Sequence, residues 1–336
     1  MADKGPGPLR STLRLAVVLL VCALAAAVLT EWVAPDRRVA GDDGFYGMVV
    51  GPQVDVDRAI PKLGALGVNT VRLRMDVRDW GRPEANTGGS AYDGALQQAP
   101  ELEDQGFRIV LQVNSEGGAM PSYQSARSLF EWLMARPGAS SVDVVEVLGP
   151  VTEQAANADA FSTRLTRAQQ AQRYVDGPLK AAWDVVHKQA GKKVLGGAFT
   201  PWQQAADRRN VGAWTLAVTQ AYVKAGYLDR VDYAGFHPDQ PTAAAQAAWV
   251  KRAAALFGEK PIWVSEWQLT RSAFPDDGAY VEAMGHSAAA LHGTLGTACY
   301  SGFTEQEGVV PVTQGGFGGY REDDPAFDAY RGWATS

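Results

Sequence analysis

Cysteine and histidine are scarce in this chain. Its 336 residues include 2 cysteines and 4 histidines, and the histidines form neither an HxH nor an HExxH pattern. Because those patterns are typical of zinc ligands, we expect no metal site, and no motif indicates a cofactor. Cys22 lies in an apolar N-terminal run and Cys299 in an expected strand, so we expect no disulfide between them.

The chain also lacks an excess of basic charge. It has 31 Lys and Arg against 37 Asp and Glu, a net charge of −6, and the basic residues are scattered. A nucleic-acid-binding domain usually concentrates basic residues on one face, so we expect no nucleic-acid partner. With 46% hydrophobic residues the composition is that of a globular protein, and it indicates no particular protein partner.

A hydrophobic segment near the N-terminus indicates export. Basic residues precede an unbroken apolar run over residues 15–29, namely Lys4, Arg10 and Arg14. We interpret residues 1–34 as a cytoplasmic tip with a membrane anchor or signal sequence, and residues 35–44 as a linker. An uncleaved segment makes a single-pass membrane protein with its main domain outside the cytoplasm. Cleavage near Ala25 or Ala27 makes a secreted one.

The remaining residues, 45–336, alternate apolar runs with helical stretches. Eight runs have the length and composition of strands: 45–50, 70–77, 107–114, 142–148, 193–200, 231–238, 262–266 and 297–304. Strands that alternate with helices form parallel sheets, and eight such units predict a closed barrel. The sequence therefore predicts an α/β fold, a (β/α)8 TIM barrel, as a single domain.

Polar residues gather where the expected strands end. Arg72, Arg74 and Asp76 alternate along the second strand, so they share one of its faces, and Asn114 ends the third strand. In the segment KPIWVSEWQ, Lys260 to Gln268, an apolar strand ends with a carboxylate, Glu266. An unpaired carboxylate is costly inside a strand, but (β/α)8 enzymes keep their reactive groups at this barrel mouth.

The other candidate residues follow the same logic. His237 ends the sixth strand, Trp202 follows the fifth, and Trp267 follows Glu266. Tryptophan rings at a barrel mouth can stack on sugars, although they pack into cores as well. Arg72 can hold Glu266 ionised across the barrel, because an opposite charge lowers a carboxylate pKa. Glu146, inside the fourth strand, is expected to pair with an arginine.

Three segments together resemble the clan of retaining (β/α)8 glycoside hydrolases that includes cellulase-like and xylosidase-like families. They are GVNTVR at 67–72, VDYAGFHP at 231–238 and KPIWVSEW at 260–267. The resemblance implies a carbohydrate ligand and Glu266 as the catalytic nucleophile. It also implies that Arg72, Arg74, Asn114 and His237 bind or orient the substrate, with Trp202 and Trp267 as further contacts.

One departure from this clan concerns the catalytic acid. The fourth strand of such proteins usually ends in Asn-Glu, whereas this chain has Gly149 and Pro150 there. Retaining hydrolysis needs two carboxyl groups about 5–5.5 Å apart, so a replacement acid is required. Glu153 is the nearest candidate. Glu116 and Glu305 are further options.

Two functions remain open from the sequence. The chain is expected to be an exported glycoside hydrolase-like protein that acts on a polysaccharide or glycan, with Glu266 and Glu153 as the catalytic residues. The alternative is a catalytically impaired pseudo-glycosidase that binds a glycan or serves as a scaffold in a cell-envelope assembly. The strand-7 segment favours the first function, and the missing strand-4 acid favours the second.

Overall fold

The computed structural model describes most of the expected barrel domain. The described residues are 46–50, 56–86, 90–152, 157, 159, 164–200, 211–238, 242–267, 269, 274–292, 297–300 and 325–335. All of them belong to one compact unit, Val39–Ser336. The N-terminal apolar run and three of the candidate residues, Glu153, Trp202 and Glu305, lie outside the described residues. Among the helices that are described, none is long and apolar enough to cross a membrane.

Eight parallel strands form a closed barrel. They are β1 (Tyr46–Val50), β2 (Thr70–Val77), β3 (Arg108–Ser115), β4 (Val144–Val147), β5 (Lys193–Gly196), β6 (Ala234–Gly235), β7 (Ile262–Trp267) and β8 (Thr297–Tyr300). Their order is β5-β4-β3-β2-β1-β8-β7-β6. Parallel bridges from Leu195 to Tyr233 and from Phe199 to Phe236 join the two ends of this sheet. The predicted (β/α)8 fold is confirmed.

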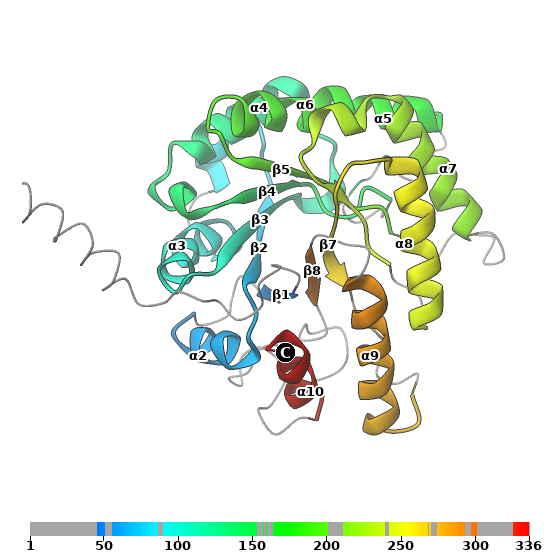
Figure 1. Ribbon diagram of the computed structural model, residues 1–336. Coiled ribbons are helices and arrows are strands. Elements are labelled where there is room, and N and C mark those ends of the chain that lie inside the picture. The colour runs from blue at the N-terminus through cyan, green and yellow to red at the C-terminus, as the bar shows by residue number, and fades with distance from the viewer. Residues whose placement is uncertain are drawn as a thin grey trace, which may run out of the picture. The chain divides into compact units, whose positions relative to one another are not determined.

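Helices surround the barrel on its outside (Figure 1). The longer ones are α2 (Val56–Leu66), α3 (Ser90–Asp104), α4 (Tyr123–Met134), α5 (Arg167–Tyr174), α7 (Val211–Lys224), α8 (Ala243–Phe257), α9 (Asp277–His292) and α10 (Pro325–Ala334). Short helical elements are η1 (Pro83–Asn86), η2 (Glu116–Gly118), η3 (Pro137–Ser141), η4 (Val175–Leu179), α6 (Lys180–Ala182), η5 (Trp183–His187) and η6 (Tyr227–Arg230). Pro178 lies in η4, a π-helical turn that follows α5 directly, because proline cannot continue regular α-helical hydrogen bonding.

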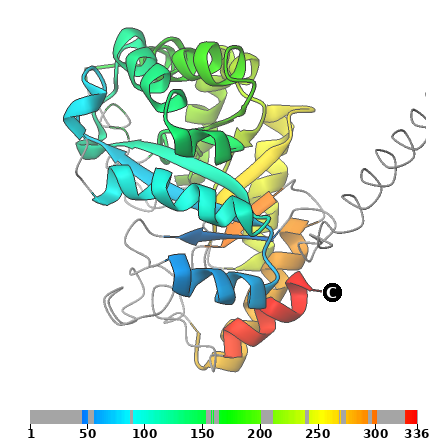
Figure 2. The same cartoon turned by 90° about the vertical axis from the view of Figure 1, so that its left-hand side faces the viewer.

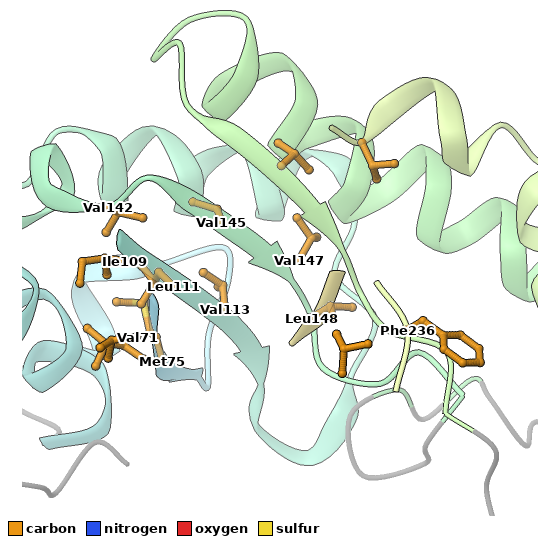
Figure 3. Packing of buried hydrophobic residues seen from close by; sticks show 14 of the residues in the cluster. Val71, Met75, Ile109, Leu111, Val113, Val142, Val145, Val147, Leu148 and Phe236 are labelled. Carbon is orange, nitrogen blue, oxygen red and sulfur yellow. The ribbon is translucent and has the colours of Figure 1, made fainter. Parts of the chain in front are cut away.

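Side chains on β2, β3 and β4 belong to two different cores, depending on whether the residue number is odd or even. Odd-numbered hydrophobic residues of β2, β3 and β4 point to the helices and join one large buried cluster, part of which Figure 3 labels, including Val71, Leu111 and Val145. Even-numbered Val110 and Val144 belong to a separate small cluster with Leu195 and Trp263, which fills the barrel interior. Successive residues of a strand face opposite sides, so even-numbered positions of β2 to β4 face the lumen.

The C-terminal helix α10 closes the outer layer. It packs between α2 and α9, as Figure 2 shows with α10 in red beside α2 in blue. Its Tyr330 hydroxyl donates a hydrogen bond of 2.8 Å to the backbone oxygen of Gly47 on β1. Through this bond α10 contacts a barrel strand directly.

The sixth strand is shorter than the sequence predicts. Residues 231–238 were expected to be extended, but regular pairing is limited to Ala234–Gly235. The backbone N–H of Gly235 donates to the Tyr227 hydroxyl at 3.1 Å, which takes the place of a strand carbonyl. A Cβ on Gly235 would come within 2.1 Å of the Gly196 oxygen, so β5 and β6 approach closely only because this residue is glycine.

Candidate active site

Arg72 connects three strands across the barrel lumen. The side chain is buried and comes from an inward-facing position of β2. Its Nε atom is 2.8 Å from Oε2 of Glu146 on β4, and its Nη1 atom is 3.2 Å from Oε2 of Glu266 on β7. A single guanidinium therefore serves two carboxylates, and both expected arginine pairings are present in the structure.

A β-bulge explains how Glu266 reaches the lumen. Between Val264 and Trp267, β7 has one more residue than its partner β8. Strict alternation would place Ser265 and Trp267 inside and Glu266 outside. The extra residue changes this parity, because a bulge redirects the side chains that follow it. Ser265 and Glu266 both bond to lumen residues, whereas Trp267 packs into the outer core.

A chain of hydrogen bonds continues from Glu146 to the far side of the lumen. The Ser265 hydroxyl donates to Oε1 of Glu146 at 2.9 Å. Nε2 of His237 is 2.9 Å from the same hydroxyl oxygen, and Nδ1 of His237 is 3.2 Å from the Thr200 hydroxyl. His237 therefore contacts Ser265 and Thr200, and its nearest link to the Arg72 network is Ser265.

The two carboxylates experience opposite electrostatic effects. Burial is the largest single effect on Glu266 and raises its pKa, but Arg72, through its charge and its hydrogen bond, and the other basic groups nearby together outweigh burial and hold that pKa below its usual value. Burial also raises the pKa of Glu146, and there it prevails over Arg72 and the Ser265 hydrogen bond, so the pKa lies above its usual value. The Glu266 side chain is 28% exposed and that of Glu146 is 0% exposed. Glu266 is therefore an ionised carboxylate that a ligand can reach.

His237 is neutral at physiological pH. Burial lowers its pKa to about 3, and the nearby negative charge of Glu266 offsets only part of this effect. A neutral imidazole has one N–H donor and one acceptor nitrogen. The two hydroxyl contacts of His237 match that requirement, so the ring is held in a fixed orientation.

A polar rim lies farther along β2 and β3. Nε of Arg74 is 2.9 Å from Oδ1 of Asp76, and Asp76 is the register partner of Asn114. Asn114 is only 6% exposed, and its Oδ1 is buried without a hydrogen-bond partner in the described part of the chain. A buried carbonyl oxygen without a donor is costly, so this position is suited to accept a hydrogen bond from a ligand hydroxyl.

The three residues that follow β4 include no carboxylate. Val147 is followed by Leu148, Gly149 and Pro150. Leu148 is buried and has a φ of 64°, a left-handed conformation that costs free energy for a residue with a Cβ. Glu153, the expected replacement acid, follows in the part of the chain that is not described.

The remaining candidates lie apart from this network. Trp267 is fully buried in the outer core, so packing accounts for its position. Glu116 is exposed on η2, the short helix after β3. Within the described residues, no group of three or more His, Cys, Asp or Glu side chains can hold a metal ion.

Sequence reasoning overlooked Ser265 and Thr200 as members of the network. Serine and threonine are common at strand ends, and neither stands in a catalytic motif. The one available signal for Ser265 was its place beside Glu266, but alternation excludes two adjacent inward side chains unless a bulge is present. The bulge depends on pairing with β8, which the local sequence does not specify.

Comparison with known proteins supports the fold. No protein-family model and no curated protein matches the sequence. Among solved structures, the chain is similar to a family 39 glycoside hydrolase from Bacteroides cellulosilyticus, with a TM-score of 0.59 and 13% identity, over 89% of this chain and 64% of that chain. The chain thus spans less than two thirds of that protein's length.

Two other solved structures are similar to this chain over most of its length. A GH30 endoxylanase from Clostridium papyrosolvens has a TM-score of 0.52 and 14% identity, over 88% of this chain and 72% of that one. A GH5_18 variant from Streptomyces cattleya, solved in complex with Manb1-4GlcNAc, has a TM-score of 0.57 and 15% identity, over 86% and 80%. The fold of this chain is the (β/α)8 barrel that these glycoside hydrolases have.

Proposed function

We propose that this protein acts on a glycan at the C-terminal end of its barrel, with Glu266 as the nucleophile. The observation that carries this proposal is the environment of Glu266, which lies at the end of β7, is partly exposed, and is held ionised by Arg72. A retaining glycosidase needs such a carboxylate to attack the anomeric carbon. The likeness in fold to glycoside hydrolases supports a carbohydrate as the ligand.

In this proposal the other residues have distinct tasks. Arg72 orients Glu266 and stabilises its charge, and Asn114 accepts a hydrogen bond from a sugar hydroxyl. His237 acts indirectly on the Arg72 network, through its contact with Ser265. Glu153, in the loop after β4, is the proposed acid that protonates the leaving oxygen. Arg74 and Trp202 complete the proposed substrate-binding residues, whereas Trp267, which we also predicted from the sequence, is buried in the outer core and has a packing role.

A second function, glycan binding without hydrolysis, is favoured by the end of β4. Leu148, Gly149 and Pro150 provide no proton donor, and Glu146 is completely buried two residues before this turn. A positioned general acid contributes about 10² to 10⁴-fold to rate, so its loss restricts turnover to substrates with good leaving groups. Such a protein would bind a glycan or act as an envelope scaffold.

Hydrolysis assays on the purified full-length protein separate the two functions. The substrates are unactivated oligosaccharides and activated aryl glycosides, each with and without azide, a small nucleophile that can complete the second step when the acid/base is absent. Cleavage of unactivated glycans that is lost in Glu266→Gln and in Glu153→Ala supports the enzyme. Cleavage limited to aryl glycosides and stimulated by azide supports the impaired form.

A matched substitution controls for general effects on the protein. Glu131 is an exposed residue of α4 whose partner is Arg127, so Glu131→Gln removes a carboxylate outside the Arg72 network. We expect this variant to retain wild-type activity and binding. Activity that survives Glu266→Gln would overturn the proposed nucleophile, and a lack of any glycan affinity in calorimetry would overturn both functions.

We further propose that the barrel lies outside the cytoplasm. The support is the order of basic residues, apolar run and polar linker in residues 1–44. A periplasmic alkaline phosphatase fused after residue 336 should be active, and the same reporter fused after residue 14 should be inactive. The opposite pattern would reverse the proposed orientation.

A further inference from the structure

We propose that Glu146, Ser265 and His237 form a buried positioning group that controls the pairing of Arg72 with Glu266. When Glu146 is ionised, it shares the guanidinium with Glu266; when it is protonated, the guanidinium is left to Glu266. The inference rests on the proposed role of Glu266 as the reacting carboxylate. Its central observation is the continuous contact from Arg72 through Glu146, Ser265 and His237.

The hydrogen bonds in this group have only one direction while Glu146 is ionised. A carboxylate can only accept, so the single hydroxyl proton of Ser265 goes to Glu146. Ser265 must then accept from the Nε2–H of His237. A neutral imidazole has its proton on one nitrogen, so Nδ1 of His237 accepts from the Thr200 hydroxyl.

Protonation of Glu146 reverses this direction. The protonated carboxyl donates to Ser265, and Ser265 donates to Nε2 of His237. The imidazole proton then lies on Nδ1 and is donated to Thr200. No heavy atom needs to move, because each proton shifts along an existing contact of 2.9, 2.9 or 3.2 Å: that of Ser265 passes to Glu146, that on Nε2 to Ser265 and that of Thr200 to Nδ1, and the added proton is taken up at Thr200. The tautomer of His237 therefore reports the protonation state of Glu146.

The group differs from a serine hydrolase triad in two respects. In a triad, the carboxylate orients the histidine, whereas here Glu146 bonds to the serine and a threonine occupies the second histidine nitrogen. Ser265 and His237 are also both buried, so a substrate carbonyl cannot approach the hydroxyl. Ser265 is therefore a positioning residue.

The charges around the two carboxylates explain how the protonation state of Glu146 affects Glu266. Glu146 faces Arg72 and Glu266, and its charge also acts on the buried hydroxyls of Tyr174 and Tyr227. Two like charges that share one cation raise each other's pKa.

Glu266 itself faces three basic side chains, Arg72, His237 and the half-exposed Arg74, of which His237 is neutral near pH 7. Loss of the Glu146 charge removes its competition with Glu266 for the Arg72 charge. Glu266 then becomes a weaker base and a weaker nucleophile. Acidification is therefore expected to reduce its reactivity through Glu146, a residue that no substrate touches.

Nitrogen-15 NMR of the histidines in the full-length protein tests this inference without any substrate. The chain has 4 histidines, and a His237→Asn variant identifies the signals of His237. In the wild type we expect the Nε2–H tautomer at neutral pH and a change toward Nδ1–H as the pH falls to about 4, before the ring itself is protonated. One tautomer at every pH would overturn the inference.

Substitutions of Glu146 and Ser265 sharpen the test. Glu146→Gln has nearly the same shape, and with its oxygen toward Arg72 its amide donates to Ser265, so the Nδ1–H tautomer is expected at every pH. Ser265→Ala interrupts the hydrogen bonds between Glu146 and His237 and should abolish the response of the His237 tautomer to pH. Ser265→Thr keeps the hydroxyl and should restore it. A response in Ser265→Ala equal to that of the wild type would contradict the role of Ser265.

Ser287→Ala is the matched control. Ser287 is also a buried serine, but it lies on α9 and donates to Gln246, outside this group. Its loss should leave the His237 signals unchanged, and an equal change in this variant would indicate a nonspecific effect of losing a buried hydroxyl. Because the readout needs no turnover, it stays decisive if the proposed glycan activity fails. If activity is found, the part of its acidic limb that Glu146 causes should disappear in Glu146→Gln, and the part that protonation of Glu266 causes should remain.

Discussion

Arg72 and Glu266 are 194 positions apart in the sequence, and their side chains meet at 3.2 Å inside the barrel. Their strands, β2 and β7, are separated in the sheet by β1 and β8. The contact therefore crosses the lumen instead of following a pair of neighbouring strands. It depends on barrel closure, and it links the proposed reacting carboxylate to the buried charge of Glu146.

Replacement of Arg72 by methionine should strongly destabilise the protein. The substitution leaves Glu146 buried without its cation, and breaking a buried ion pair on one side typically costs about 3–5 kcal/mol. The free energy of unfolding from urea titration measures the effect. Arg127→Met, which removes an exposed partner of Glu131, should cause no measurable loss. Equal stability of the two variants would contradict the central role of Arg72.

Stability should rise with pH between about 3 and 6.5 because of His237. Its pKa is lowered from 6.5 to about 3 in the folded state, so in this range the unfolded chain binds a proton that the folded chain excludes. The stabilisation is complete above the unfolded pKa and is lost as the pH falls, by about 1.4 kcal/mol per unit. Urea titrations at a series of pH values should show a flatter profile for His237→Asn than for the wild type.

Other titratable groups also contribute to the change of stability with pH. Glu266, whose pKa is lowered, adds stability of the same sign at lower pH, whereas Glu146, whose pKa is raised, opposes it just above its unfolded pKa. The exposed His286 on α9 is a control, and His286→Asn should keep the wild-type slope. A wild-type slope in His237→Asn would show that other groups dominate.

Two buried asparagines should respond oppositely to alanine. Asn114→Ala removes an oxygen that has no partner among the described residues, so stability should be unchanged or higher while glycan affinity falls. Asn86 accepts from the backbone of Arg78 and Asp79 and donates to three backbone oxygens, so Asn86→Ala should cost several hydrogen bonds, each about 1 kcal/mol. Thermal unfolding and calorimetric titration with oligosaccharides measure the two effects. A stability loss in Asn114→Ala equal to that in Asn86→Ala would contradict the assignment.

A methyl group at Gly235 should weaken barrel closure. The added Cβ would lie 2.1 Å from the Gly196 oxygen and 3.1 Å from backbone atoms of Ala198, none of which can move cheaply. Overpacking of this kind typically costs about 1–3 kcal/mol. Gly64→Ala, at an exposed and open position of α2, should stabilise by about 0.5–1 kcal/mol. Denaturant unfolding distinguishes them, and similar values would show that β5 and β6 can separate at no cost.

Local pattern was sufficient for most of the fold. The expected strand over residues 70–77 matches β2 at both ends, because a long run of β-formers with period-two polar residues has few alternatives. The same periodicity placed Arg72, Arg74 and Asp76 on one face of this strand, which is the lumen side in the structure. The strand over residues 231–238 was overestimated, because the hydroxyl of Tyr227, from a different element, takes the hydrogen bond of Gly235.

The sequence by itself determined the barrel, the inward position of Arg72 and a carboxylate at the tip of the seventh strand. The tertiary structure decided which side chains meet. The bulge that turns both Ser265 and Glu266 inward arises from pairing with β8, a contact that local sequence does not encode. The division of Arg72 between Glu146 and Glu266 likewise exists only when distant strands close around one lumen, because short-range charge contacts depend on distance in space.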